Sequence, residues 1–188
     1  CFAGNAALLG CCDLVIATRG SNIGMGGPAM VEGGGLGRFP PEAIGPAQVQ
    51  HANGVIDLLV DDEAQAVAAA RHYLSFFQGR VKDWIAPDAH ALRDLVPENR
   101  LRVYDTRAVM AGLVDQGSLL MLRDGFGIGI HTALARIEGR PVGLMANNPL
   151  HLGGAIDADA ADKAARFMQL CTAHSLPIVS LVDTPGFM

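Results

Sequence analysis

The placement of glycine in the first thirty-seven residues constrains this chain more than any other feature. An apolar run that leads to Arg19 follows Gly4-Asn5 and precedes two glycine-rich segments, Ser21–Pro28 and Glu32–Gly37. Glycine has no Cβ, so its backbone N–H groups can come close to a ligand. Two such loops around one apolar strand predict a protein that binds a negatively charged oxygen with main-chain amides, as enzymes do for an enolate or oxyanion.

Composition and charge exclude several broad classes of protein. The chain has 188 residues, of which 50% are hydrophobic and 18% are charged, enough for a large core. A net charge of −5 argues against a general nucleic-acid binder, and apolar runs such as Ile178–Val182 are too short to cross a membrane. No secretory signal is visible, so we expect a protein of the cytoplasm or of an organelle lumen, with no nucleic-acid or membrane partner.

The ends and the cysteines carry two further expectations. The chain begins at Cys1 without a methionine and stops at Met188, just after a strand-like run, which suggests an internal piece of a longer protein. Its four cysteines have no C-x-x-C spacing, and we expect them to be buried, reduced thiols. They are Cys1, Cys11, Cys12 and Cys171.

Hydrophobic periodicity predicts an α/β fold in two units. In residues 1–79 we expect a helical start and then a strand over Leu8–Thr18, and a second strand at Val55–Val60. A helix after Asp61-Asp62 should bury one face and end at Gly79; that face carries Val67, Ala70, Leu74 and Phe77. Residues 80–105 are rich in proline and charge and are interpreted as an interdomain connector with a short helix; a surface insertion within one domain is the alternative.

The second unit, residues 106–188, has the clearer pattern. Strands are expected at Leu119–Leu122, Thr132–Glu138 and Pro141–Ala146, and a buried strand at Leu176–Val182. Between the last two, a helix from Asp157 to His174 should bury Ala160, Ala164, Phe167 and Cys171. Strand, glycine loop, helix and strand in this order predict an α/β class.

Most familiar catalytic motifs are absent from the sequence. There is no G-x-x-x-x-G-K-[ST], no dinucleotide fingerprint in the right context and no G-x-S-x-G. No histidine pair has zinc-ligand spacing, so no metal is expected. The remaining possibility is that main-chain amides stabilise an oxyanion. One such hydrogen-bond donor lowers the free energy of the transition state by about 2.7–4 kcal/mol.

An ordered series of short segments resembles the carboxyltransferase subunits of biotin-dependent acyl-CoA carboxylases, such as propionyl-CoA and methylcrotonyl-CoA carboxylases. Cys1–Ala6 resembles their C-x-A-G-G-A segment, with Asn5 where the family often has glycine. Each segment alone is weak evidence for the family, but the ordered series covers the whole chain apart from the connector. The other matching segments are Gly26-Gly27-Pro28, Glu42–Gly45, Asn53–Val55, Asp61–Glu63, Ala135–Gly143, Ala146–Pro149, Asp159–Phe167 and Pro177–Phe187.

The resemblance implies a crotonase-like ββα superhelix, of which the chain holds parts of two related halves. It implies that carboxybiotin supplies CO2 to the enolate of an acyl-CoA, and that a biotin carboxylase, a biotin carboxyl carrier and a homo-oligomer are involved. Gly4 and Asn5 would be oxyanion donors, and the piece alone is expected to be inactive. Substrate-binding residues would be Gly26, Gly27, Pro28, Asn147, Gly153 and Gly154.

Other interpretations of the same residues stay open. The glycines near Gly4 could pack a helix on a sheet, and the other glycine and asparagine segments could be plain turns. Another crotonase-fold enzyme, a hydratase or decarboxylase, would need a carboxylate acid/base, for which Glu32 is the one loop candidate. A scaffold that binds without turnover is the non-enzyme alternative.

Overall fold

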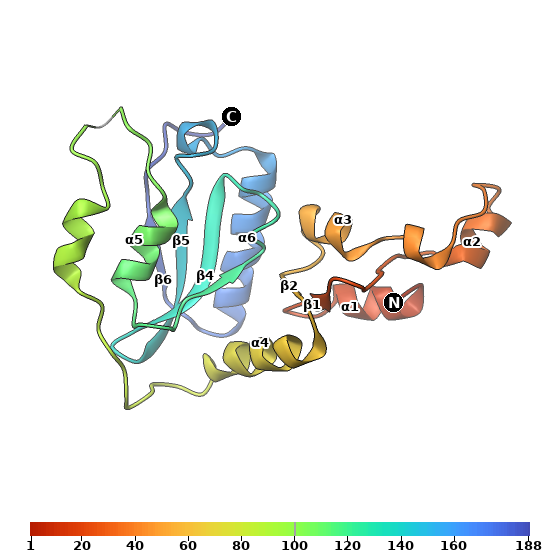
Figure 1. Cartoon of the computed structure of the whole chain (residues 1–188), viewed down its shortest axis with the longest axis horizontal. Coiled ribbons are helices and arrows are strands. Elements are labelled where there is room, and N and C mark those ends of the chain that lie inside the picture. Colours follow the sequence, from red (N-terminus) through yellow and green to blue (C-terminus); the bar gives the residue numbers. More distant parts are fainter. Residues whose placement is uncertain (100) are drawn as a thin grey trace. The chain divides into compact units, whose positions relative to one another are not determined.

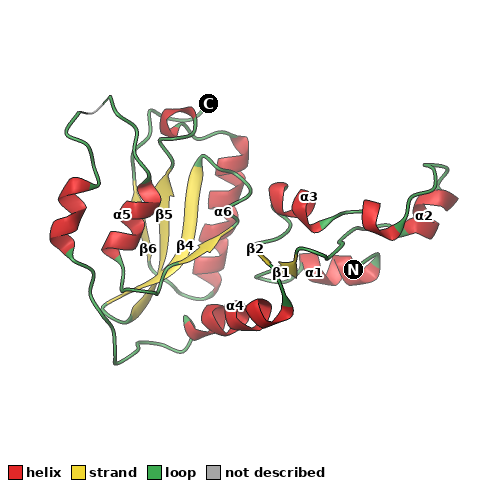
Figure 2. Ribbon diagram, in the orientation of Figure 1, coloured by secondary structure: helices red, strands yellow, loops and turns green. Residues whose placement is uncertain are grey.

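Two β-sheets organise the chain, and each belongs to a separate unit. The computed structural model describes residues 1–99 and 101–188, which divide into units Cys1–Ala70 and Arg71–Met188, with the boundary inside a helix. Helices and strands alternate in both units (Figures 1 and 2), so the α/β class is confirmed.

The first unit pairs two short parallel strands, β1 (Ile16–Thr18) and β2 (Leu58–Val60). The Val15 N–H donates to the buried carboxylate of Asp57 (2.7 Å), which ties the start of β1 to the start of β2. Apolar residues such as Ile23 and Ile56 form the core of the unit. The helices are α1 (Gly4–Gly10), α2 (Pro28–Gly33), α3 (Ala47–Ala52), α4 (Glu63–Ser75, which crosses the boundary) and the 3-10 turn η1 (Pro41–Ala43).

A four-stranded sheet in the order β3-β4-β5-β6 forms the centre of the second unit. The pairs β3–β4 and β4–β5 are antiparallel, and β6 runs parallel to β5. The strands are β3 (Leu120–Leu122), β4 (Ile130–Ile137), β5 (Arg140–Asn147) and β6 (Ile178–Leu181). The helices are α5 (Thr106–Leu113), α6 (Ala158–Ala173) and the 3-10 turns η2 (Ala89–Asp94) and η3 (Leu152–Gly154).

Helices α5 and α6 cover opposite faces of this sheet, as Figure 1 shows. Leu144 packs in a core with Met110 of α5. A Cβ on the next residue, Gly143, would lie 2.5 Å from the sulfur of Cys171 on α6. Successive residues of a strand point to opposite faces, so the two helices lie on the two sides.

Three expectations about α4 and β6 are wrong: the buried face of α4, the end of α4 and the burial of β6. In α4 the buried side chain is Tyr73, whereas Val67 and Leu74 are exposed, and the helix ends at Ser75 before Phe77. The strand expected to be buried is β6, an edge strand whose residues alternate between exposed and partly buried, because no further described strand covers it.

The cysteine expectation holds for one residue of four. Cys171 is buried on α6, and burial raises the pKa of its thiol to about 11. Cys1, Cys11 and Cys12 are exposed, because they lie at the chain start and in the turn that follows α1.

Candidate functional site

The amides of Gly4 and Asn5 open helix α1 and have no hydrogen-bond partner among the described residues. The N–H groups of Ala6 and Ala7 both donate to the carbonyl of Ala3 instead. Helix starts leave such donors free for a cap or a ligand, and no side chain caps this one. The geometry therefore leaves two adjacent N–H donors available to a ligand oxygen.

Backbone strain lies directly before these two amides. Ala3 has φ 54° and ψ −126°, a conformation that costs a non-glycine residue about 1–3 kcal/mol. Two hydrogen bonds fix it: Ala3 N–H donates to Gly24 O (3.1 Å), and Gly24 N–H donates to Cys1 O (3.0 Å). The surrounding structure thus holds the chain in the conformation from which Gly4 and Asn5 start the helix.

The segment Gly26-Gly27-Pro28 lies next to the same turn. Gly27 precedes α2, Pro28 is its first residue, and a Cβ on Gly27 would lie 3.7 Å from the ring of Phe2. The structure therefore brings two of the predicted segments together, Gly4-Asn5 and Gly26–Pro28. In α2, the exposed carboxylate of Glu32 forms an ion pair with Arg38.

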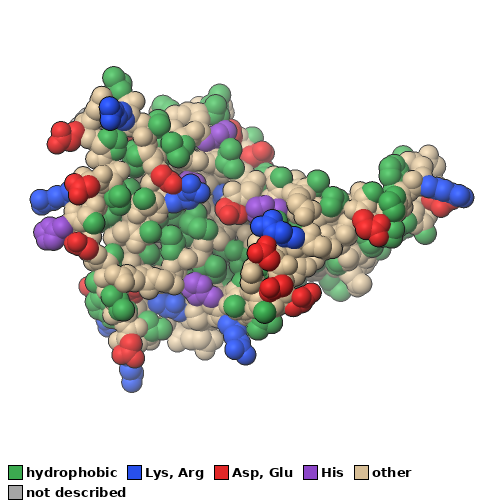
Figure 3. Space-filling model, viewed as in Figure 1, with side chains coloured by type: hydrophobic (Ala, Val, Ile, Leu, Met, Phe, Trp, Pro, Cys, Tyr) green, Lys and Arg blue, Asp and Glu red, His purple; other side chains and the backbone are tan. Residues whose placement is uncertain are grey.

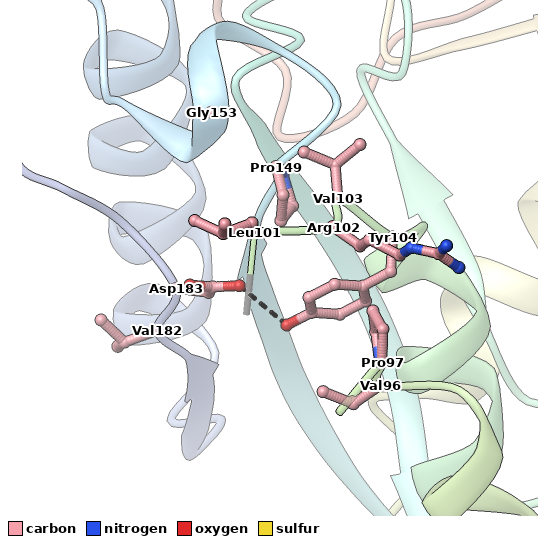
Figure 4. Close-up of a pocket in the computed structure, with 10 residues that line it drawn as sticks. All are labelled: Val96, Pro97, Leu101, Arg102, Val103, Tyr104, Pro149, Gly153, Val182 and Asp183. Carbon is pink, nitrogen blue, oxygen red and sulfur yellow. Dashed lines mark hydrogen bonds between the residues drawn. The ribbon is translucent and has the colours of Figure 1, made fainter. Parts of the chain in front are cut away.

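A pocket of about 450 Å³ lies in the second unit (Figure 4). It includes Gly153, one of the predicted site residues, and none of the first unit's predicted residues. The rest of its lining combines apolar residues with the polar side chains of Arg102, Tyr104 and Asp183. The apolar residues are Val96, Pro97, Leu101, Val103, Pro149 and Val182. Ligand sites in proteins typically combine such an apolar wall with a few placed polar groups.

Tyr104 and Asp183 supply polar groups at this pocket and bind each other across 79 residues of chain. The Tyr104 hydroxyl donates to Asp183 Oδ2 at 2.9 Å, drawn as the dashed line in Figure 4. Burial, and then the hydrogen bond to Asp183, raise the pKa of the Tyr104 phenol. The hydroxyl therefore stays protonated and keeps donating near neutral pH.

Asn147 is buried at the end of β5 and connects three segments around the pocket without lining it. Its carbonyl accepts from Thr106 Oγ1 (2.8 Å), its Oδ1 accepts from the Asp183 N–H (3.2 Å), and its Nδ2 donates to Gly154 O (3.4 Å). The main-chain carbonyl of Asn147 thus holds the start of α5, and its side chain holds the turn at Asp183 and the glycine loop.

Three consecutive residues of η3 have left-handed backbone, with φ of 48° at Leu152, 62° at Gly153 and 87° at Gly154. A Cβ on Gly154 would lie 2.4 Å from Asp183 O, so close approach demands glycine there. The N–H groups of Leu152 and Gly153 have no partner among the described residues, while that of Gly154 donates to His151 O. The loop thus leaves the amide of Gly153, a residue of the pocket lining, without a partner among the described residues.

A histidine–aspartate pair follows this loop. His151 Nε2 lies 3.1 Å from Asp157 Oδ2, and Asp157 Oδ1 caps α6 by accepting from the Ala160 N–H. The bond from Ala160, and then that from His151, lower the pKa of Asp157. In the part of the chain that the structure describes, no group of His, Cys, Asp and Glu side chains could hold a metal ion.

Sequence reasoning missed Tyr104, Asp183 and the connector as parts of a pocket. Asp183 lies in a turn that the sequence did mark, and Tyr104 only marked the start of the second unit. Their contact depends on how the connector folds back, which no local pattern encodes. Proline and apolar residues between 95 and 104, in a segment otherwise rich in charge, were the one available signal.

The carboxyl transferase domain family matches residues 1–188. An uncharacterized carboxylase, YngE, from Bacillus subtilis is 33% identical over 99% of this chain and 38% of its own length. The methylmalonyl-CoA carboxyltransferase 12S subunit of Propionibacterium freudenreichii is 33% identical over 94% of this chain and 35% of its own. The chain thus spans little more than a third of these relatives.

Solved structures agree with the sequence matches. A single-chain, multi-domain long-chain acyl-CoA carboxylase superposes with a TM-score of 0.97 and 61% identity, over all of this chain and 19% of its own. The transcarboxylase 12S hexamer superposes with a TM-score of 0.87 and 32% identity, over all of this chain and 39% of its own. The crotonase-like α/β fold is therefore confirmed. No described helix has the length and apolar character needed to cross a bilayer. By its sequence and its fold, the chain belongs to the carboxyl transferase domain family.

Proposed function

We propose that the chain is part of a carboxyltransferase that moves CO2 from carboxybiotin to the α-carbon of an acyl-CoA. The observation that carries this proposal is the 61% identity, over the whole chain, to a long-chain acyl-CoA carboxylase. That relative also favours a thioester with a long acyl chain. Biotin on its carrier supplies the activated carboxyl group, so a biotin carboxylase, a carrier and a homo-oligomer are the partners we propose.

The amides of Gly4 and Asn5 act on the substrate as an oxyanion hole in this proposal. Removal of the α-proton shifts negative charge to the thioester oxygen, and donors aimed at that oxygen lower the barrier by about 2.7–4 kcal/mol each. Neither N–H group has a partner in the part of the chain that the structure describes, and the strained Ala3 precedes them directly. Gly26, Gly27 and Pro28 would shape the adjoining wall.

The second unit contributes the pocket and the glycine loop. Gly153 offers a free N–H at the pocket, Gly154 allows the close approach to Asp183, and Asn147 holds both segments. We assign residues 1–79 to the end of the first carboxyltransferase half, 80–105 to the connector and 106–188 to the start of the second half.

The hydratase alternative receives no support from Glu32. A carboxylic acid that donates a proton near neutral pH normally lies in an apolar, buried place. Glu32 is instead half exposed and paired with Arg38. Catalysis by main-chain amides requires no such carboxylate.

A proline substitution tests the oxyanion role, because it deletes one N–H. Asn5→Pro, in the first turn of α1, leaves the internal hydrogen bonds of the helix intact. In the full-length protein with its biotin carboxylase and carrier, we expect kcat for biotin-dependent CO2 incorporation into acyl-CoA to fall about 10²–10³-fold.

The matched control is Asn5→Ala, which removes the side chain and keeps the amide. We expect its kcat to change only a few-fold. Equal losses in both variants would contradict the amide role. An unmodified full-length complex that carboxylates no acyl-CoA would overturn the proposed function and favour a scaffold.

A further inference from the structure

The side chain of Gln50, on α3, binds the main chain of a segment that lies 27 residues earlier. Its Nε2 donates to the carbonyl of Ile23. Ile23 is only 5% exposed, and no other donor among the described residues binds this carbonyl. A buried carbonyl that loses its donor costs free energy, so Gln50 satisfies a group that the fold cannot easily leave unpaired.

Gly45 leaves the space that this hydrogen bond needs. A Cβ on Gly45 would lie 1.9 Å from Ile23 O and 2.9 Å from Gln50 Nε2. Its φ of 58° is also one that glycine adopts readily. The Gly45 carbonyl accepts the Ile23 N–H at 2.8 Å, so both main-chain groups of Ile23 are held, one by Gly45 and the other by Gln50.

The peptide group that Gln50 binds is the one that fixes the start of the chain. The Ile23 carbonyl and the Gly24 N–H belong to the same planar peptide group and point in opposite directions. The Gly24 N–H donates to Cys1 O (3.0 Å), and the Gly24 carbonyl accepts from the Ala3 N–H (3.1 Å). A rotation of this plane would therefore change the bonds to Cys1 and Ala3 together with the bond to Gln50.

Asn53 holds the amide of Gln50 in the donating orientation. Its Nδ2 donates to Gln50 Oε1 at 2.9 Å, so the oxygen of the Gln50 amide is occupied and the nitrogen is the group that binds Ile23. Two side chains at the end of α3 thus form a short chain of hydrogen bonds that leads to the Ile23–Gly24 peptide group.

We propose that Gln50 is a positioning residue for the oxyanion hole: through the Ile23–Gly24 peptide group it holds Ala3 in the conformation that presents the amides of Gly4 and Asn5 to the thioester oxygen. This inference rests on the proposed function. Amides aimed at a developing negative charge act more strongly on the transition state than on the bound substrate. Loss of Gln50 should therefore lower kcat and leave KM for the acyl-CoA nearly unchanged.

Removing the donor tests this role. Gln50→Met keeps an unbranched side chain and deletes the N–H groups. In the full-length protein with its biotin carboxylase and carrier, we expect kcat for CO2 incorporation into acyl-CoA to fall at least about tenfold, with KM changed less than about twofold. Asn53→Ala, at an exposed position, leaves Gln50 in place without its partner and should lower kcat in the same way but less. This milder variant keeps the test decisive if Gln50→Met does not fold.

The matched control is Gln48→Met on the same helix. Gln48 Nε2 also donates to a main-chain carbonyl, that of Arg19 (3.0 Å), but this carbonyl takes no part in binding Cys1 or Ala3. We expect its kcat to stay within about twofold of the unmodified protein. An equal loss in the Gln48 and Gln50 variants would show a general effect of α3 and would overturn the positioning role.

A double variant separates this inference from the function on which it rests. If Gln50 acts through the oxyanion amides, Gln50→Met combined with Asn5→Pro should lose less kcat than the product of the two single losses. Independent losses, or a rise in KM without a fall in kcat, would overturn the role of Gln50 while carboxyl transfer stands. If the unmodified complex carboxylates no acyl-CoA, the proposed function itself fails.

Discussion

Two adjacent glycines of η3 allow a matched test at the scale of single residues. Both have positive φ, but a Cβ on Gly154 would lie 2.4 Å from Asp183 O, whereas a Cβ on Gly153 meets nothing within 4 Å. Gly153→Ala should cost about 1 kcal/mol of unfolding free energy from backbone strain alone. Gly154→Ala should cost about 3 kcal/mol, because strain and overlap add. Urea unfolding of the full-length protein measures both, and equal losses would contradict the close approach.

The buried Lys163 predicts a pH dependence of stability. Its side chain is 1% exposed and donates to Phe126 O at 2.9 Å, and burial lowers its pKa from 10.5 to about 8. Between these values the unfolded chain binds more protons than the folded chain, so this residue makes stability rise with pH. We expect that rise between about pH 8 and about pH 10 to be smaller in Lys163→Met, as measured by urea midpoints. Parallel pH profiles of the two proteins would contradict the lowered pKa.

At the scale of elements, the hairpin of β4 and β5 depends on one buried carboxylate. Asp115 accepts the N–H groups of Glu138 (3.0 Å) and Gly139 (2.7 Å), which form the turn. Asp115→Ala would leave both donors without that acceptor, so we expect a loss of about 3 kcal/mol of unfolding free energy. Asp115→Asn keeps one side-chain oxygen and should lose less. The control is Asp159→Ala at an exposed position. If Asp115→Ala loses as little unfolding free energy as this control, the two hydrogen bonds of Asp115 contribute little to stability.

The elements that the sequence predicted well are those with local signals. Strands β4 and β5 follow from apolar runs around Glu138-Gly139, where the glycine suits the positive φ of the second turn residue. Helix α6 follows from its cap Asp157 and its apolar period. The predicted end of α4 was wrong because it depends on contacts with residues distant in the sequence. The helix ends before Phe76, which is buried with its ring centre 4.5 Å from the guanidinium carbon of Arg136.

The candidate site was likewise only partly predictable from the sequence. The sequence marked Gly4, Gly153 and Gly154 as candidate places of close backbone approach. Only Gly154 has such a neighbour, because a Cβ on Gly4 or Gly153 would meet nothing within 4 Å. Which amides stay free was not visible, because that depends on the pairing of Ala3 with Gly24 and on the turns of η3. The contact between Tyr104 and Asp183 joins two segments whose own sequences carry no sign of each other.

At the scale of the whole molecule, the exposed apolar residues of the first unit predict assembly. Met25, Met30 and Leu36 are all largely exposed around α2, where Figure 3 shows hydrophobic side chains at the surface. Apolar surface of this kind typically marks an interface, and the related 12S protein is a hexamer. We expect the full-length protein to be an oligomer that buries this surface. Met30→Glu combined with Leu36→Glu should then give a smaller species in light scattering after size exclusion, because burying two charges opposes association. Met168→Glu, an exposed methionine of α6, is the control, and an unchanged mass in the double variant would place the interface elsewhere.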